Sequence, residues 1–168
     1  IESVIVTTMQ AISGAGYPGV ASLDITDNVF PYIAGEEPKV EIEAQKILGT
    51  LTPNGIQKAD FTVSAQCFRV NVIDGHTASV RVNLKETATL EDVVEAMRSF
   101  PSLDLHSSPK RFIDVTDEPT RPQPRLDRDN GDGMTITVGR VFPDNIFDYR
   151  FVALSHNTVR GAAGSAVL

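Results

Sequence analysis

The stretch FTVSAQCFRVNVIDGHTASVRVNL, Phe61–Leu84, determines the fold class. Apolar side chains alternate on one face through Phe61–Cys67, and the alternation resumes on the opposite parity from Phe68. A β-bulge at this point would explain the slip in phase, and bulges often re-aim side chains beside active sites. Asp74-Gly75 favours a tight turn, after which the alternation returns in Ala78–Leu84. The stretch therefore predicts a β-hairpin.

Further elements are predicted on both sides of this stretch. Apolar and β-branched runs predict strands at Glu2–Thr8, Phe112–Val115, Met134–Val141 and Tyr149–Leu154. Helical spacing predicts amphipathic helices at Glu36–Gly49, after a Thr89–Asp92 capping box, and in Asn157–Leu168. The polar, Pro-rich segment 119–133 is predicted to be a long loop. Because strands outnumber helices, we expect an α+β fold, a mostly antiparallel mixed sheet with helices packed on one face.

Composition narrows the class of protein. With 168 residues, 41% of them hydrophobic, the sequence suits one compact domain, residues 1–168. A formal net charge of −7 argues against general affinity for nucleic acid, and no apolar run approaches the ~18 residues of a membrane span. Cys67 is the only cysteine, so an internal disulfide is excluded and a cytoplasmic location is expected. Since Ile1 opens directly on a strand, we expect the sequence to begin inside a longer polypeptide.

Two glycine-containing segments superficially match known ligand-binding motifs, the dinucleotide fingerprint and the calcium loop. Gly14-x-Gly16-x-x-Gly19 matches the dinucleotide fingerprint, but Pro18 interrupts it and no clear helix follows. A tight turn that lets a ligand approach the backbone is the preferred interpretation, and an ordinary surface turn is the alternative. Segment 127–133 lacks the glutamate of a calcium loop, and the three histidines show no ligand spacing. We therefore predict no metal site.

A few residues could carry chemistry. Cys67 lies mid-strand among apolar positions, where most cysteines are inert packing residues. His76 follows the turn and Arg69 lies on the other predicted strand, so both could face one pocket, where the arginine fork would bind a carboxylate. Taken alone, each is more often a surface histidine or a salt-bridge residue. Glu43 and Lys46 stand three apart on the predicted helix, a spacing that by itself favours a solvated ion pair.

Several stretches together resemble the second half of the aspartate-semialdehyde dehydrogenases, specifically the archaeal and fungal branch. These stretches are Thr7–Gly16, Glu43–Gly49, Arg69–Thr77 and Asn157–Gly164. The resemblance covers nearly the whole chain, and each stretch is weak alone. It implies a C-terminal domain like that of glyceraldehyde-3-phosphate dehydrogenase. It also implies that the N-terminal NADP-binding domain and the nucleophilic cysteine lie upstream of this sequence.

The resemblance also implies a reaction. In that family L-aspartyl-4-phosphate is reductively dephosphorylated to L-aspartate 4-semialdehyde with NADPH, through a cysteine thioester. The step leads to lysine, methionine, threonine and isoleucine. Phosphate and the semialdehyde are therefore expected ligands, and a homodimer or homotetramer is expected to form through an apolar strand face left uncovered by helices.

The resemblance assigns residues to three tasks. The catalytic group is His76 as general acid/base and Gln10, which would orient the acyl group. The substrate-binding group is Arg69 for the α-carboxylate, Glu43 for the amino group and Lys46 for the phosphate. The cofactor-binding group is Ser13, Gly14 and Asn157, which would line the nicotinamide cofactor.

Two alternatives stay open. A related thioester-forming reductase such as malonyl-CoA reductase could use the same scaffold, although Glu43 speaks against it because malonyl has no amino group. A dimerisation module without activity of its own is the other. The sequence leaves open the source organism, dimer versus tetramer, and NADP versus NAD.

Overall fold

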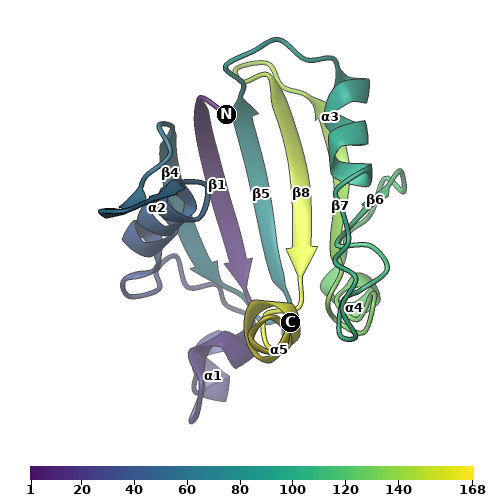
Figure 1. Cartoon of the computed structure of the whole chain (residues 1–168). Coiled ribbons are helices and arrows are strands. Elements are labelled where there is room, and N and C mark those ends of the chain that lie inside the picture. The colour runs from purple at the N-terminus through teal and green to yellow at the C-terminus, as the bar shows by residue number, and fades with distance from the viewer.

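The computed structural model describes all 168 residues, which form a six-stranded sheet, a separate two-stranded hairpin and short helices around them (Figure 1). The strands are β1 (Ser3–Gln10), β2 (Thr50–Thr52), β3 (Gly55–Gln57), β4 (Thr62–Arg69), β5 (His76–Asn83), β6 (Ile113–Thr116), β7 (Ile136–Pro143) and β8 (Tyr149–Ser155). The helices are α1 (Ser22–Ile25), α2 (Glu36–Ile47), α3 (Leu90–Arg98), α4 (Pro124–Asp127) and α5 (Gly164–Val167), with a 3-10 turn at Ile12–Ala15 and a π-helical turn at Val159–Ala163.

The main sheet has the order β4-β1-β5-β8-β7-β6. β1 runs parallel to β4 and β6 parallel to β7, while the three central pairings are antiparallel. The predicted α+β class with a mixed sheet is thus confirmed. The hairpin predicted for Phe61–Leu84 is wrong, because β1 lies between β4 and β5 and the chain crosses the end of β1 in segment 70–75. Alternation identifies a strand but does not say which strand lies beside it.

The predicted bulge is also absent. β4 pairs with β1 without a register shift from Thr62 to Arg69, and both Cys67 and Arg69 are buried on the same face. The apolar residues from Phe68 onward alternate on the opposite parity because β4 ends at Arg69, and most of them lie beyond the strand. The apolar residues that follow belong to the connection, which bonds to the loop after β1 through Val72.

The two main helices are confirmed. α2 begins at Glu36 and ends two residues before the predicted Gly49. α3 begins with the predicted capping box, in which Thr89 is the N-cap and Asp92 is the third helical residue. The predicted loop at 119–133 contains the short helix α4, and the C-terminal segment is a π-helical turn followed by α5 rather than one regular α-helix.

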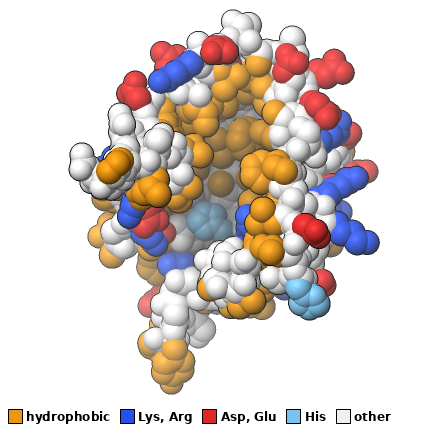
Figure 2. Space-filling model, in the orientation of Figure 1, with side chains coloured by type: hydrophobic (Ala, Val, Ile, Leu, Met, Phe, Trp, Pro, Cys, Tyr) orange, Lys and Arg blue, Asp and Glu red, His pale blue; other side chains and the backbone are white.

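One face of the sheet is open between the helices. α2 packs against β4 and α3 packs against β6 and β7, at the two flanks of the sheet. Figure 2 shows a hollow between these flanks, lined with hydrophobic side chains and with a histidine side chain visible in it. The register places Val6, Val80 and Phe151 side by side on one face of the central strands. In this structure no helix combines the length and the apolar character that crossing a bilayer requires.

Candidate active site

Four residues form a row across the sheet at one end of its strands. The register aligns Arg69 on β4, Gln10 on β1, His76 on β5 and Ser155 on β8. Residues directly opposite on neighbouring strands point to the same face, so these side chains share one surface. Gln10 and Arg69 are buried, and His76 is half-buried. Arg69 and His76 therefore flank a common place, with Gln10 between them.

The first turn of α2 adds a carboxylate and an ammonium group to this row. The Oε2 atom of Glu36 accepts a hydrogen bond from Nε2 of Gln10 at 3.1 Å, and its Oε1 lies 3.5 Å from Nζ of Lys39. Gln10 Nε2 also donates to Oγ1 of Thr8, at 3.3 Å. Glu36 and Lys39 were not among the predicted site residues, although they stand at the same three-residue spacing as Glu43 and Lys46.

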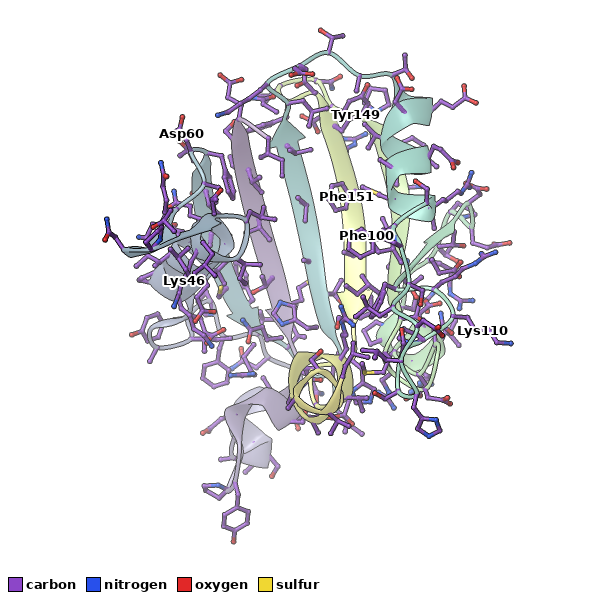
Figure 3. All side chains as sticks on the ribbon, viewed as in Figure 1. Lys46, Asp60, Phe100, Lys110, Tyr149 and Phe151 are labelled. Atoms are coloured by element: carbon purple, nitrogen blue, oxygen red, sulfur yellow. The ribbon has the colours of Figure 1, made fainter.

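Glu43 and Lys46 lie elsewhere. They follow Glu36 and Lys39 by seven residues, which is about two turns and roughly 10.5 Å along the helix axis. Both side chains are exposed and form no ion pair with each other. Figure 3 shows Lys46 at the flank of the molecule on α2, away from the lower ends of β1, β5 and β8. The structure therefore does not bring Glu43 and Lys46 to the row. The only sequence signal for the other pair is its place beside Pro38 at the start of the helix.

Burial and charge favour a neutral imidazole at His76. Burial is the main cause that lowers the pKa of His76, and the nearby Arg69 guanidinium lowers it further, whereas the Glu36 carboxylate opposes both. A neutral imidazole can accept a proton at neutral pH. Arg69 donates one guanidinium hydrogen bond within the chain, from Nη1 to the carbonyl of Ala11 at 2.7 Å. Its other donors remain for a ligand carboxylate.

Cys67 has the opposite character. Its side chain is fully buried, and burial raises the pKa of the thiol, with the neighbouring carboxylates of Glu36 and Glu37 raising it further. A buried, protonated thiol is a poor nucleophile. The geometry supports the prediction that Cys67 is a packing residue.

Ser13, Gly14 and Asn157 meet beside the row. Asn157 donates from Nδ2 to Oγ of Ser13 and accepts at Oδ1 from the backbone N–H of Gly75, both at 2.8 Å. A Cβ at Gly14 would lie 2.9 Å from Nη1 of Arg69, so glycine permits the loop to approach the guanidinium. Since Ser13 Oγ accepts from Asn157, its hydroxyl hydrogen can donate to a ligand.

The remaining predicted motifs do not join this site. The loop after β1 turns through the 3-10 segment and leads only to the four-residue α1, so the dinucleotide-type helix is absent. His106 is exposed, and His156 is buried with Nε2 3.6 Å from Asp129. No three His, Cys, Asp or Glu side chains are grouped to hold a metal ion.

A cavity elsewhere in the molecule does not include any residue of the row. A cavity of about 900 Å³ lies around segment 106–111 and is lined mainly by polar residues, about half of which are exposed. A smaller recess of about 150 Å³ has Arg69 in its wall together with Phe30 and Tyr32. Convergent charged and hydrogen-bonding groups are better evidence of a reaction centre than volume. The row is therefore the candidate active site.

Comparison with known proteins identifies relatives along the chain. The family model for the semialdehyde dehydrogenase dimerisation domain matches residues 1–160. The aspartate-semialdehyde dehydrogenase of Archaeoglobus fulgidus is 54% identical over 168 residues, which are 100% of the chain and 49% of that relative. The enzyme of the same name from Aspergillus fumigatus is 53% identical over 180 residues, covering 100% of the chain and 50% of that relative. The chain thus spans about half the length of the curated relatives it matches.

Solved structures agree with these relatives. The crystal structure of aspartate semialdehyde dehydrogenase with NADP from Candida albicans superposes with a TM-score of 0.87 at 44% identity, covering 99% of this chain and 49% of that one. The structure of aspartate semialdehyde dehydrogenase II complexed with ASA from Vibrio cholerae has a TM-score of 0.77 at 26% identity, with 99% and 53% covered.

Proposed function

The chain belongs to the semialdehyde dehydrogenase family, and on that premise we propose that it is the substrate-binding, proton-transferring and dimerising half of an aspartate-semialdehyde dehydrogenase. The observation that carries the proposal is the row of Arg69, Gln10 and His76 with Glu36 against it. A substrate with a carboxylate and an ammonium group on one carbon requires a cation and an anion held close together.

The substrate is L-aspartyl-4-phosphate in one direction and L-aspartate 4-semialdehyde with phosphate in the other. Arg69 binds the α-carboxylate through its free guanidinium donors. In this proposal the roles that the resemblance gave to Glu43 and Lys46 pass to Glu36 and Lys39. Glu36 receives the amino group and Lys39 the phosphate, because they stand at the row and the other pair stands two turns away.

His76 is the general acid/base. As a neutral imidazole it accepts the proton of a cysteine thiol supplied by the other half of the enzyme, so that a thiolate attacks the acyl carbon and phosphate leaves. Gln10 lies between His76 and Arg69 and orients the acyl group. Its side-chain nitrogen is engaged by Glu36 and Thr8.

NADP is the cofactor in this proposal, and NADPH supplies the hydride when bound. The residues of this chain fit one edge of the nicotinamide, because Ser13 presents a hydroxyl donor and Asn157 holds it in place. Gly14 lets this loop lie directly against Arg69, which brings a cofactor at the loop near the substrate site.

The chain is also proposed to associate as a homodimer or homotetramer in the cytoplasm. Because the row lies on the same face as Val6, Val80 and Phe151, a partner on this face would cover the site. The opposite face, where Ile5 on β1 remains 39% exposed, is the better candidate for the contact between subunits.

The test is an assay of the full-length enzyme that contains this chain. It should form NADPH from aspartate semialdehyde, NADP and phosphate, and it should not act on malonyl-CoA. The chain alone should sediment as a dimer and show no turnover, since it lacks the acyl-accepting thiol. Turnover by the chain alone that Cys67→Ala abolishes, or sedimentation only as a monomer, would refute the proposal.

A further inference from the structure

The outer edge of β4 is covered by side chains of α2. Even-numbered residues at the ends of this strand bond to β1, because the N–H of Thr62 donates to Glu2 and that of Val70 donates to Gln10. In a strand the N–H groups of alternate residues point to opposite edges, so those of Ala65 and Cys67 point outward. An uncovered edge of this kind invites pairing with another chain.

Three polar side chains of α2 bond to this edge. Oε1 of Glu37 accepts from the N–H of Cys67 at 3.1 Å, and Oε1 of Glu41 accepts from the N–H of Ala65 at 3.0 Å. Nε2 of Gln45 donates to the carbonyl of Phe61 at 2.8 Å. We call Glu37, Glu41 and Gln45 the edge ladder. Its order along the two elements shows that α2 runs antiparallel to β4.

The spacing of the edge ladder matches the strand. Side chains four residues apart on a helix rise by about 6 Å, and two residues of a strand span about 6.6 Å. Two successive carboxylates therefore reach two successive outward N–H groups. Sliding α2 by one residue would turn the three side chains away from the edge and leave those groups without acceptors, which is costly in partly buried positions.

Glu36 lies next to the first residue of the edge ladder. Its carboxylate reaches Gln10 in the row, 3.1 Å away, while Glu37 reaches the backbone of β4. No residue of α2 is fully buried, so apolar packing on the sheet is limited. The hydrogen bonds of the edge ladder thus restrict where the first turn of α2 can lie.

We propose that Glu37, Glu41 and Gln45 are positioning residues, which fix the register of α2 on β4 and thereby place Glu36 and Lys39 against the row. The catalytic part of this inference rests on the proposed function. The structural part, that the edge ladder places Glu36 on Gln10, does not.

Glu41 provides the cleanest test because it contacts no residue of the row. Glu41→Ala removes the acceptor of the Ala65 N–H, whereas Glu41→Gln keeps a carbonyl oxygen there. Ile42→Ala is the matched control, since Ile42 is half-exposed on the same helix and outside the edge ladder. In Glu41→Ala, hydrogen exchange of the Ala65 amide should rise about tenfold. The NMR signals of the Gln10 side-chain amide should shift, and Glu41→Gln should restore both.

The kinetic arm uses the full-length enzyme. Glu41→Ala should raise KM for aspartate semialdehyde by about fivefold or more and leave KM for NADP near the wild-type value. Glu41→Gln and Ile42→Ala should behave like the wild type. Unchanged Ala65 exchange, unchanged Gln10 signals or an equal rise in both KM values would each overturn the inference. If the wild-type enzyme has no such activity, the proposed function fails, and the two NMR readouts still decide whether the edge ladder positions Glu36.

Discussion

At the scale of single residues, the protonation state of His76 depends on its burial and on the charges of Arg69 and Glu36. Burial lowers the pKa of His76 most, because it disfavours the charged imidazolium, and the positive charge of the Arg69 guanidinium lowers this pKa further. Glu36 opposes both effects, because its carboxylate raises the pKa of His76. In the proposed mechanism one carboxylate therefore acts on both the substrate and the general base.

This balance predicts a pH dependence. Since the pKa of His76 is lowered below the ordinary imidazole value, the neutral form that the proposed general base requires is present at neutral pH, and activity should be lost as pH falls through the lowered pKa. Glu36→Gln removes the carboxylate that favours the protonated form, so the pKa of His76 should fall further. The acidic limb of kcat/KM should move to lower pH, and the NMR titration of the His76 ring should move the same way.

The titration does not depend on activity, which matters because Glu36→Gln is also expected to weaken substrate binding. Glu43→Gln removes the same charge two turns away and serves as the control. An unchanged or raised His76 pKa in Glu36→Gln would contradict the electrostatic account of this site.

At the scale of the elements, the position of α2 determines which carboxylate and which lysine lie at the row. Glu36 and Glu43 lie on nearly the same stripe of the helix, but only the first turn of α2 meets the end of β1. Glu36→Gln should raise KM for aspartate semialdehyde by about 10 to 100-fold, the effect of losing a hydrogen bond to a charged group. Glu43→Gln should leave it near the wild-type value. Steady-state kinetics of both variants measures the difference, and the reverse order would show that the resemblance had assigned the correct pair.

Much of the fold could be predicted from sequence because its elements carry local signals. The alternation in β4 and β5, the helical spacing of α2 and the capping box at Thr89 are all properties of neighbouring residues. The insertion of β1 between β4 and β5 could not be predicted in this way. It depends on pairing between segments more than fifty residues apart.

The site residues likewise divide into those that the sequence predicted and those that depend on long-range packing. His76, Arg69 and Gln10 were singled out from the sequence, and the register aligns them in one row, although the reason is β1 and not a hairpin. Glu36 and Lys39 were missed because two pairs with identical spacing occur on one helix. The sequence of a helix does not state which of its turns meets the sheet.

At the scale of the whole molecule, the proposed function makes the chain one side of a reaction centre. The row lies at one end of the central strands, on the face that carries Val6, Val80 and Phe151, and in the proposal another part of a longer enzyme approaches it there. Within the chain the only thiol is Cys67, which is buried and protonated. In the proposed function the nucleophile therefore comes from outside the chain, and His76 is the general base.

The most direct test is kcat of the full-length enzyme with aspartate semialdehyde, NADP and phosphate for His76→Asn, with Cys67→Ala measured beside it. We expect His76→Asn to lower kcat by about 10² to 10⁴-fold, the usual contribution of a positioned proton transfer, with smaller changes in KM. Cys67→Ala should keep wild-type kcat once its folding is verified. Near-normal kcat in His76→Asn would contradict the assignment of His76 as general acid/base, and loss of turnover in a folded Cys67→Ala would contradict an external nucleophile.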